Sequence, residues 1–151
     1  MKFDRFSVQL VRESTVHYEA KQIREPAGIY EILCNELNLD KKLQEEMHII
    51  MLNVKMKPIG SSMISMGGLA SCACSPREIF RPAIVAGAYA VILAHNHPSG
   101  EAGPSSADIE ATVKAVQSGN IIGITVADHI ICGNNGYCSL RESYPDIFKE
   151  A

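Results

Sequence analysis

The sequence has no apolar run long enough to cross a membrane. Its longest such run, residues 83–94, includes a glycine and falls short of the roughly 20 residues that a spanning helix needs. The first residues mix charged and apolar side chains, and no hydrophobic segment of a signal peptide is visible. We therefore expect a cytoplasmic protein that does not associate with membranes.

The sequence also lacks an excess of basic residues. It has 14 Lys and Arg residues against 17 Asp and Glu residues, a net charge of −3, and the basic residues are scattered. A domain that binds phosphate backbones usually carries a basic excess clustered on one face. Direct binding of DNA by this chain alone is therefore disfavoured.

The cysteines do not form the pattern of a disulfide framework. There are five of them, an odd number in a chain without a visible export signal. Cys72 and Cys74 are the only close pair, whereas a zinc knuckle needs two residues between its cysteines and a second pair. We expect no cysteine metal site, and we expect most of the thiols to be small buried hydrophobes.

The sequence does contain enough apolar material for one folded domain. Its 151 residues fall within the usual range of about 100–200, and 46% of them are hydrophobic. Periodicity and turn residues predict strands at 1–11, 48–54, 60–66, 90–94, 121–131 and 137–140, with helices starting near Pro26, Ser75 and Ser105. This order predicts a mixed α/β domain with one sheet and helices packed on it, and it leaves the strand order open.

Capping residues mark the expected helix boundaries. Ser75 and Glu78 have the spacing of an N-cap and a capping-box acid around a first-turn proline. Gly87 is expected to close that helix, and Gly119 to follow the end of the helix at 105–118. The apolar faces expected to be buried are Tyr30, Leu33, Cys34 and Leu37 in the first helix and Ile109, Val113 and Val116 in the last.

The most informative segment begins where the buried strand at 90–94 ends. It reads HNHPSGEAGPSSAD over residues 95–108. Residues i and i+2 of an extended chain point the same way, so His95 and His97 can aim at one point while Asn96 turns aside. A Gly- and Pro-rich loop then brings Asp108 to the first turn of the next helix. Two imidazoles and one carboxylate with an open fourth position are the ligand set of a catalytic zinc site.

A purely structural interpretation of the same residues stands beside this one. Ser105 and Asp108 also have the spacing of a capping box, in which Asp108 would only satisfy helix amides. His95 and His97 would then be polar residues at the end of a strand. That interpretation leaves unexplained why two histidines share one face beside a loop that ends at an acid. We therefore favour the metal site.

The motif resembles the JAMM signature of JAB/MPN-domain metalloproteases, in which His-x-His-Pro is followed at fixed spacing by Ser and Asp. It is closer still to the RadC-like branch, which has His-Asn-His-Pro-Ser-Gly and a later Pro-Ser and Asp. The flanking segments 75–80 and 128–131 also resemble RadC, and the likeness extends from residue 24 to the C-terminus. It implies one JAB/MPN domain over 1–151, with 1–24 as a candidate N-terminal extension. The implied fold is α/β, a single mixed, curved sheet flanked by helices, of the cytidine-deaminase-like class.

The resemblance also implies roles for individual residues. His95, His97 and Asp108 would hold Zn²⁺, and Ser105 would help to stabilise an oxyanion. A glutamate ahead of an early core strand is the general acid and base of such enzymes. The segment QEEMHIIMLN at 44–53, which resembles RadC, assigns that role to Glu45.

Other titratable residues have structural interpretations. Glu46 is adjacent to Glu45, so the register of the general base stays open between the two. Glu78 is accounted for by its expected capping box. His129 could lie near the site, but a histidine at a strand end is more often structural.

The predicted activity is cleavage of a peptide or isopeptide amide by a zinc-dependent metallohydrolase of the JAMM type. One departure weakens any inherited link to DNA: RadC proteins carry a helix-hairpin-helix region before the JAB domain, and too few residues precede Glu45 to form it. The alternatives are a RadC-like DNA-repair or mobile-element accessory protein and a metal-dependent nuclease. A zinc deaminase is disfavoured because Pro-Cys-x-x-Cys is missing. The identity of the protein or peptide substrate and the oligomeric state stay open.

Overall fold

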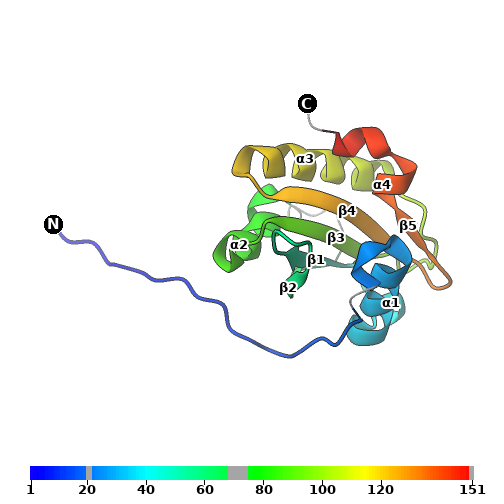
Figure 1. The fold of residues 1–151 in the computed structure, drawn as a ribbon, viewed down its shortest axis with the longest axis horizontal. Helices are drawn as coiled ribbons and strands as arrows, with labels where there is room; N and C mark the ends of the chain where they lie inside the picture. The colour runs from blue at the N-terminus through cyan, green and yellow to red at the C-terminus, as the bar shows by residue number, and fades with distance from the viewer. Residues whose placement is uncertain (20–21, 68–74, 150–151) are drawn as a thin grey trace.

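One five-stranded sheet forms the centre of the fold (Figure 1). The computed structural model describes residues 1–19, 22–67 and 75–149. The strands are β1 (Glu46–Leu52), β2 (Pro58–Met66), β3 (Ala90–Asn96), β4 (Thr125–Cys132) and β5 (Tyr137–Ser139), arranged in the order β2-β1-β3-β4-β5. β3 and β4 pair in parallel, and the three other pairs are antiparallel. The predicted α/β fold with a single mixed sheet flanked by helices is confirmed.

Helices cover both faces of this sheet (Figure 1). They are α1 (Pro26–Leu37), α2 (Pro76–Ala86), α3 (Ser106–Ile122) and the short α4 (Leu140–Ser143), with 3-10 turns η1 (Gln22–Arg24), η2 (Leu39–Lys41) and η4 (Pro145–Phe148). One apolar cluster joins Phe80 of α2 and Val116 of α3 to Leu93 of β3. A second cluster on the opposite face joins Leu33 of α1 to Ile92 of β3. The two clusters are the apolar interior on either side of the sheet.

β3 is the central strand, and every one of its residues is buried. An apolar run without polar alternation is typical of a strand that is covered on both faces, which is what the sequence of this segment predicts. The run ends at His95 and Asn96, which are still buried at 0% and 1% exposure. Polar side chains are thus held at the end of a strand that is buried along its whole length.

α3 is longer than its sequence predicts. The helix continues through Gly119 to Ile122, and it ends at Gly123, whose φ of 83° is left-handed. A side chain at Gly119 would overlap the carbonyl oxygen of Ile124. Gly119 therefore allows the chain that enters β4 to pass close to the helix, and it does not end the helix. The expected strand at 121–131 is shortened for the same reason and begins at Thr125.

The buried faces of the helices are also rotated from the predicted ones. In α3 the buried residues are Asp108, Thr112, Ala115, Val116 and Gly119, whereas Ile109 and Val113 are only half-buried. In α1, Leu33 is buried as expected, together with Ile29 and Ile32. Asp108 and Thr112 are polar residues on the buried face of α3. The spacing of apolar residues in the sequence therefore does not predict that they are buried.

Two local predictions are wrong. Residues 1–19 form no helix or strand, and the alternating side chains Phe6, Val8 and Leu10 are exposed because no strand among the described residues pairs with them. The hydroxyl of Ser75 makes no capping bond, and Glu78 instead accepts a hydrogen bond from Arg81 at 2.7 Å. α2 still begins at Pro76 and ends at Gly87, as the proline and glycine predict.

The described cysteines are free thiols. Cys132 is buried, whereas Cys34 and Cys138 are half-buried, and the pair Cys72 and Cys74 lies outside the described residues. Within the part of the chain that the structure describes, no helix is both long enough and apolar enough to span a bilayer.

Candidate metal centre

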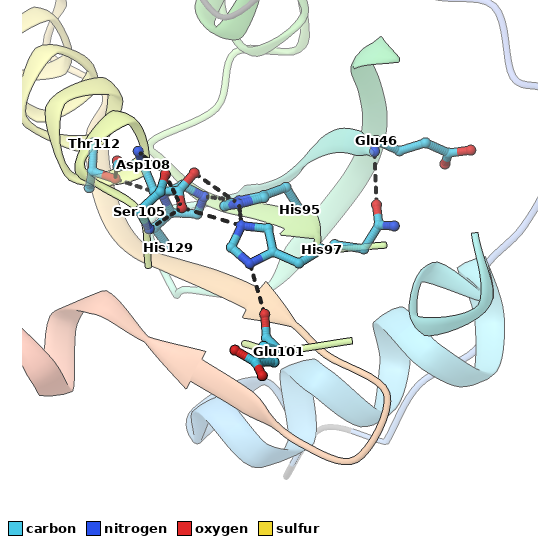
Figure 2. A network of polar contacts seen from close by, with 9 residues as sticks. Glu46, His95, His97, Glu101, Ser105, Asp108, Thr112 and His129 are labelled. Atoms are coloured by element: carbon cyan, nitrogen blue, oxygen red, sulfur yellow. Dashed lines mark hydrogen bonds and ion pairs between the residues drawn. The ribbon is translucent and has the colours of Figure 1, made fainter. Parts of the chain in front are cut away.

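The three predicted metal ligands converge at one end of β3 (Figure 2). His95 lies near the end of the strand, His97 directly follows it, and Asp108 lies in the first turn of α3. The side chains of His95 and Asp108 are 0% and 1% exposed, whereas that of His97 is 17% exposed. The cluster is therefore buried on two sides and accessible to solvent beside His97.

The spacing of the three side chains suits tetrahedral coordination. Nε2 of His95 lies 3.0 Å from Nε2 of His97 and 3.1 Å from Oδ1 of Asp108. Nε2 of His97 lies 3.3 Å from Oδ2 of Asp108. Zinc–ligand distances of about 2.0–2.1 Å imply that tetrahedral ligand atoms are about 3.3 Å apart. The residues present therefore fit a zinc ion in both donor type and spacing.

A backbone contact determines which nitrogen of His97 faces the cluster as an acceptor. Nδ1 of His97 lies 2.8 Å from the carbonyl oxygen of Glu101 (Figure 2). A carbonyl oxygen only accepts, so Nδ1 carries the proton and Nε2 of the neutral ring keeps its lone pair. That lone pair points at the carboxylate of Asp108, and two electron-rich groups at this distance repel unless a cation lies between them.

Asp108 combines the two roles that the sequence leaves open. Its Oδ2 accepts hydrogen bonds from the backbone N–H of Ser105 at 2.6 Å and from the Ser105 hydroxyl at 2.8 Å, which completes a capping box at the start of α3. Its Oδ1 faces His95. Burial opposes ionisation, but the contact with His95 and the two hydrogen bonds from Ser105 lower the pKa of Asp108 below its usual range. The capping box thus keeps an anionic carboxylate aimed at the two histidines.

The loop between His97 and α3 is held against the β4–β5 hairpin. The backbone N–H of Asn134 donates to the carbonyl oxygen of Gly100 at 3.0 Å. Gly100 has a left-handed φ of 87°, and a Cβ there would collide with the side chain of Asn134. Glycine is therefore required where the loop crosses the hairpin. This contact fixes the loop that carries the carbonyl group bound by His97.

Asn96 turns away from the cluster, as the alternation predicts, and binds the chain just before β1. Its Oδ1 accepts from the backbone N–H of Glu46 at 2.8 Å, and its amide donates to the carbonyl oxygens of Gln44 at 3.1 Å and Lys42 at 3.4 Å. The residue between the two histidines therefore fixes the segment that carries both candidate general bases.

The two candidate bases are adjacent residues where β1 begins, with Glu46 as its first residue. The carboxylate of Glu46 contacts Nε2 of His48 at 2.9 Å, and Figure 2 shows its side chain turned away from the cluster. Met47 lies directly opposite His95 in the β1–β3 pairing, so these two side chains share a face. Alternation then places half-buried Glu45, whose carbonyl oxygen accepts from Gly67 N–H at 2.8 Å, on the face of His95. The geometry thus favours Glu45 over Glu46 as the residue beside the site.

Two further polar residues lie behind His95 (Figure 2). His129 of β4 contacts Nδ1 of His95 through its Nε2 at 2.7 Å, and its Nδ1 lies 2.7 Å from the hydroxyl of Thr112 on α3. Burial lowers the pKa of His129 well below its usual range. This ring lies within β4 and contacts a candidate ligand directly, so His129 lies beside the site, which is one of the two interpretations that the sequence leaves open.

Comparison with known proteins identifies the family. A model of the RadC-like JAB domain matches residues 23–144. The chain belongs to this family. It is 49% identical over 98 residues to a UPF0758 protein of Symbiobacterium thermophilum, covering 65% of this chain and 42% of the relative. It is 42% identical over 120 residues to a UPF0758 protein of Caldanaerobacter subterraneus, which covers 80% of this chain and 51% of that relative. It is 39% identical over 138 residues to a UPF0758 protein of Listeria innocua, which covers 90% of this chain and 61% of that relative.

The RadC-like JAB domain thus accounts for most of this chain but not for the whole of such relatives. The chain spans about half the length of the curated relatives it matches. The matched segment contains all three candidate ligands, Ser105 and Glu45. The family is therefore shown for the part of the molecule that forms the site.

The contacts of Asn96 lead to a prediction about stability. Asn96→Ala removes the partners of one buried N–H and two carbonyl groups, and we expect the free energy of unfolding to fall by about 1–3 kcal/mol. Urea denaturation measures this change. Asn120→Ala, at an exposed position of α3, is the matched control and should stay within about 0.5 kcal/mol of the wild type. Equal denaturation midpoints for Asn96→Ala and the control would show that the contacts of Asn96 with residues 42–46 do not stabilise the fold.

Proposed function

We propose that this RadC-like JAB domain is a zinc-dependent hydrolase that cleaves a peptide or isopeptide amide bond. The observation that supports the proposal most directly is the convergence of His95, His97 and Asp108 at near-tetrahedral spacing, with an accessible side at His97. Zinc held there would act as a Lewis acid and would lower the pKa of water. Hydroxide would then be available near neutral pH to attack an amide. The chain's own residues orient the ligands and move protons.

Glu45 is the proposed general base and acid. On the His95 face of the sheet, its carboxylate would accept a proton from water and pass it to the departing amine. The hydrogen bonds between Asn96 and the backbone of residues 42–46 would fix the position of that carboxylate. The pairing of Glu46 with His48 on the opposite face favours Glu45 over Glu46 in this role.

Ser105 has two proposed tasks. Its hydroxyl donates to Asp108 at 2.8 Å, which supports a role in orienting that ligand. The predicted role in stabilising an oxyanion needs the same proton to turn toward substrate, and the exposed position of Ser105 leaves room for that rotation. Both tasks would require Ser105 to lie beside the reacting group.

Family membership supports a second candidate equally well, a RadC-like DNA-repair or mobile-element accessory protein. The same three ligands would also serve a metal-dependent nuclease. The net charge of −3 counts against direct action on DNA, because phosphate binding relies on a basic surface. We therefore place amide hydrolysis first, with an unidentified protein or peptide as the substrate.

Removal and return of the metal tests the proposal. We expect zinc-loaded protein to cleave members of a mixture of peptides and lysine-linked isopeptide conjugates, and we expect the chelator-treated protein to lose that activity. Added zinc should restore cleavage, and mass spectrometry of the products measures it. Duplex and single-stranded DNA form parallel arms of the experiment. Zinc-dependent cleavage of DNA with all amides intact would replace the proposed activity by a nuclease.

A further inference from the structure

A chain of buried side chains leads away from the metal centre through His95 (Figure 2). His95 Nδ1 lies 2.7 Å from His129 Nε2, and His129 Nδ1 lies 2.7 Å from the hydroxyl oxygen of Thr112. The same hydroxyl oxygen lies 2.6 Å from the backbone carbonyl oxygen of Asp108. His95, His129 and Thr112 are each 0% exposed, so bulk solvent does not compete for these contacts.

The carbonyl group at the far end sets the direction of the first hydrogen bonds. The Asp108 carbonyl oxygen has only lone pairs, so its contact with Thr112 requires the hydroxyl proton. A hydroxyl has one proton, and the Thr112 oxygen is then left as an acceptor. The proton between Thr112 and His129 must therefore belong to Nδ1 of His129.

The direction continues from His129 to the metal centre. The two ring nitrogens of His129 contact a hydroxyl and another imidazole, and a charged ring buried in such surroundings would be costly. A neutral ring with its proton on Nδ1 has its lone pair on Nε2, so it accepts a proton from Nδ1 of His95. His95 is thereby left with an unprotonated Nε2, the nitrogen that faces His97 and Asp108.

We propose that Thr112 and His129 are positioning residues, which hold His95 in the tautomer and ring orientation that bind a metal ion. This inference rests on the metal site of the proposed function. Thr112 lies one turn after Asp108 on α3, so a single helix would present one ligand and orient another through β4. The hydrogen bond from His97 to the Glu101 carbonyl gives the second imidazole the same tautomer by a separate contact.

The alternative is that Thr112 and His129 only fill space between α3 and β4. Shape alone would be preserved by Thr112→Val, which keeps the branched side chain and removes the hydroxyl. Thr112→Ser keeps the hydroxyl and removes a methyl group. A packing role therefore predicts that the serine variant is affected at least as much as the valine variant, whereas the hydrogen-bond chain predicts the opposite order.

The tautomer of His129 can be read in metal-free protein. ¹⁵N NMR at slightly alkaline pH distinguishes protonated from unprotonated ring nitrogens, and the chain has only five histidines to assign. We expect the proton of His129 on Nδ1 in the wild type and in Thr112→Ser. In Thr112→Val the Nδ1 proton has lost its acceptor, so we expect the proton to shift toward Nε2. A wild-type His129 that is protonated on Nε2 overturns the proposal.

Zinc affinity gives the second readout, by competition with a chromophoric chelator. Thr112→Val and His129→Leu should weaken zinc binding by about 10–100-fold, the usual cost of losing a group that orients a metal ligand. Thr112→Ser and His129→Gln, whose side-chain carbonyl can still accept from His95, should stay near the wild type. His48→Gln is the matched control, because His48 is a buried histidine on the opposite face of the sheet.

The outcomes separate this inference from the proposed function. If the wild type binds zinc and Thr112→Val binds it equally well, the positioning role is wrong. If the wild type binds no zinc, the proposed function fails, and the His129 tautomer with its response to Thr112→Val still decides the hydrogen-bond chain. Should His129→Leu fail to fold, the valine and serine variants at position 112 carry the test alone.

Discussion

Replacing His97 by alanine is expected to abolish tight zinc binding. Wild-type protein purified without a histidine tag should carry one zinc ion per chain. The three donor atoms lie 3.0–3.3 Å from one another, which is close to the spacing of ligand atoms around a tetrahedral zinc ion. Loss of a group that only orients a ligand costs about 10–100-fold in affinity, so loss of a ligand itself should exceed about 100-fold. Elemental analysis of the purified variants measures the zinc content directly. His17→Ala, at an exposed position outside the cluster, is the control and should keep the ion.

Thermal unfolding separates the metal-binding role of a ligand from its structural role. Metal binding stabilises the folded state, so a chelator should lower the melting temperature of the wild type but not that of His97→Ala. Asp108→Ala should lose zinc as well, and it should be less stable even in chelator, because its capping box contributes about 0.5–2 kcal/mol. Zinc at the wild-type level in His97→Ala would show that the three residues do not hold the ion.

The sequence predicts the convergence of the three candidate ligands because their geometry is local. The apolar run at 90–94 predicts a strand buried on both faces, and the two-residue alternation then points both histidines the same way. The spacing of Ser105 and Asp108 predicts the helix start that brings in the carboxylate. Each step depends on neighbours within about a dozen residues, and the structure brings the three side chains together as these steps require.

The supporting residues depend on contacts between distant segments. His129 is separated from His95 by 34 positions, and its contact requires the parallel pairing of β3 with β4, whose register no local pattern reveals. One signal was present, since His129 is a polar residue directly before the apolar end of β4. Thr112 gave a second signal, as a polar side chain four residues after Asp108 on the buried face of α3.

Tertiary contacts also explain the failed element boundaries. A glycine in a helix usually favours termination, yet Gly119 lies inside α3 because the chain leading to β4 needs the space. Alternation in residues 6–10 favours a strand, but a strand needs a partner, and the part of the chain that the structure describes places no strand beside these exposed side chains. In both cases the local preference is real, and the surrounding structure decides the outcome.

Glu45→Gln is expected to keep the zinc ion and to lose about 10²–10⁴-fold in the rate of amide hydrolysis, the usual scale for removing a general base. The carboxylate is proposed to move a proton, not to bind the metal, so zinc content should match the wild type. The alternation of β1 supports this choice, because Met47 faces His95 and Glu45 lies two residues before it. Rates on a substrate identified by the zinc-dependent screen, together with elemental analysis, measure both quantities.

Glu46→Gln is the control that tests the register. Its carboxylate is held by His48 at 2.9 Å and Lys42 at 3.5 Å on the opposite face of the sheet, so the substitution should leave the hydrolytic rate near that of the wild type. If Glu46→Gln loses activity while Glu45→Gln keeps the full rate, the general base is Glu46 and the alternation argument fails at the start of β1. If neither substitution changes the rate, proton transfer does not pass through this segment. Zinc-dependent hydrolysis would then use a general base outside this segment, and the role proposed for Glu45 would be wrong.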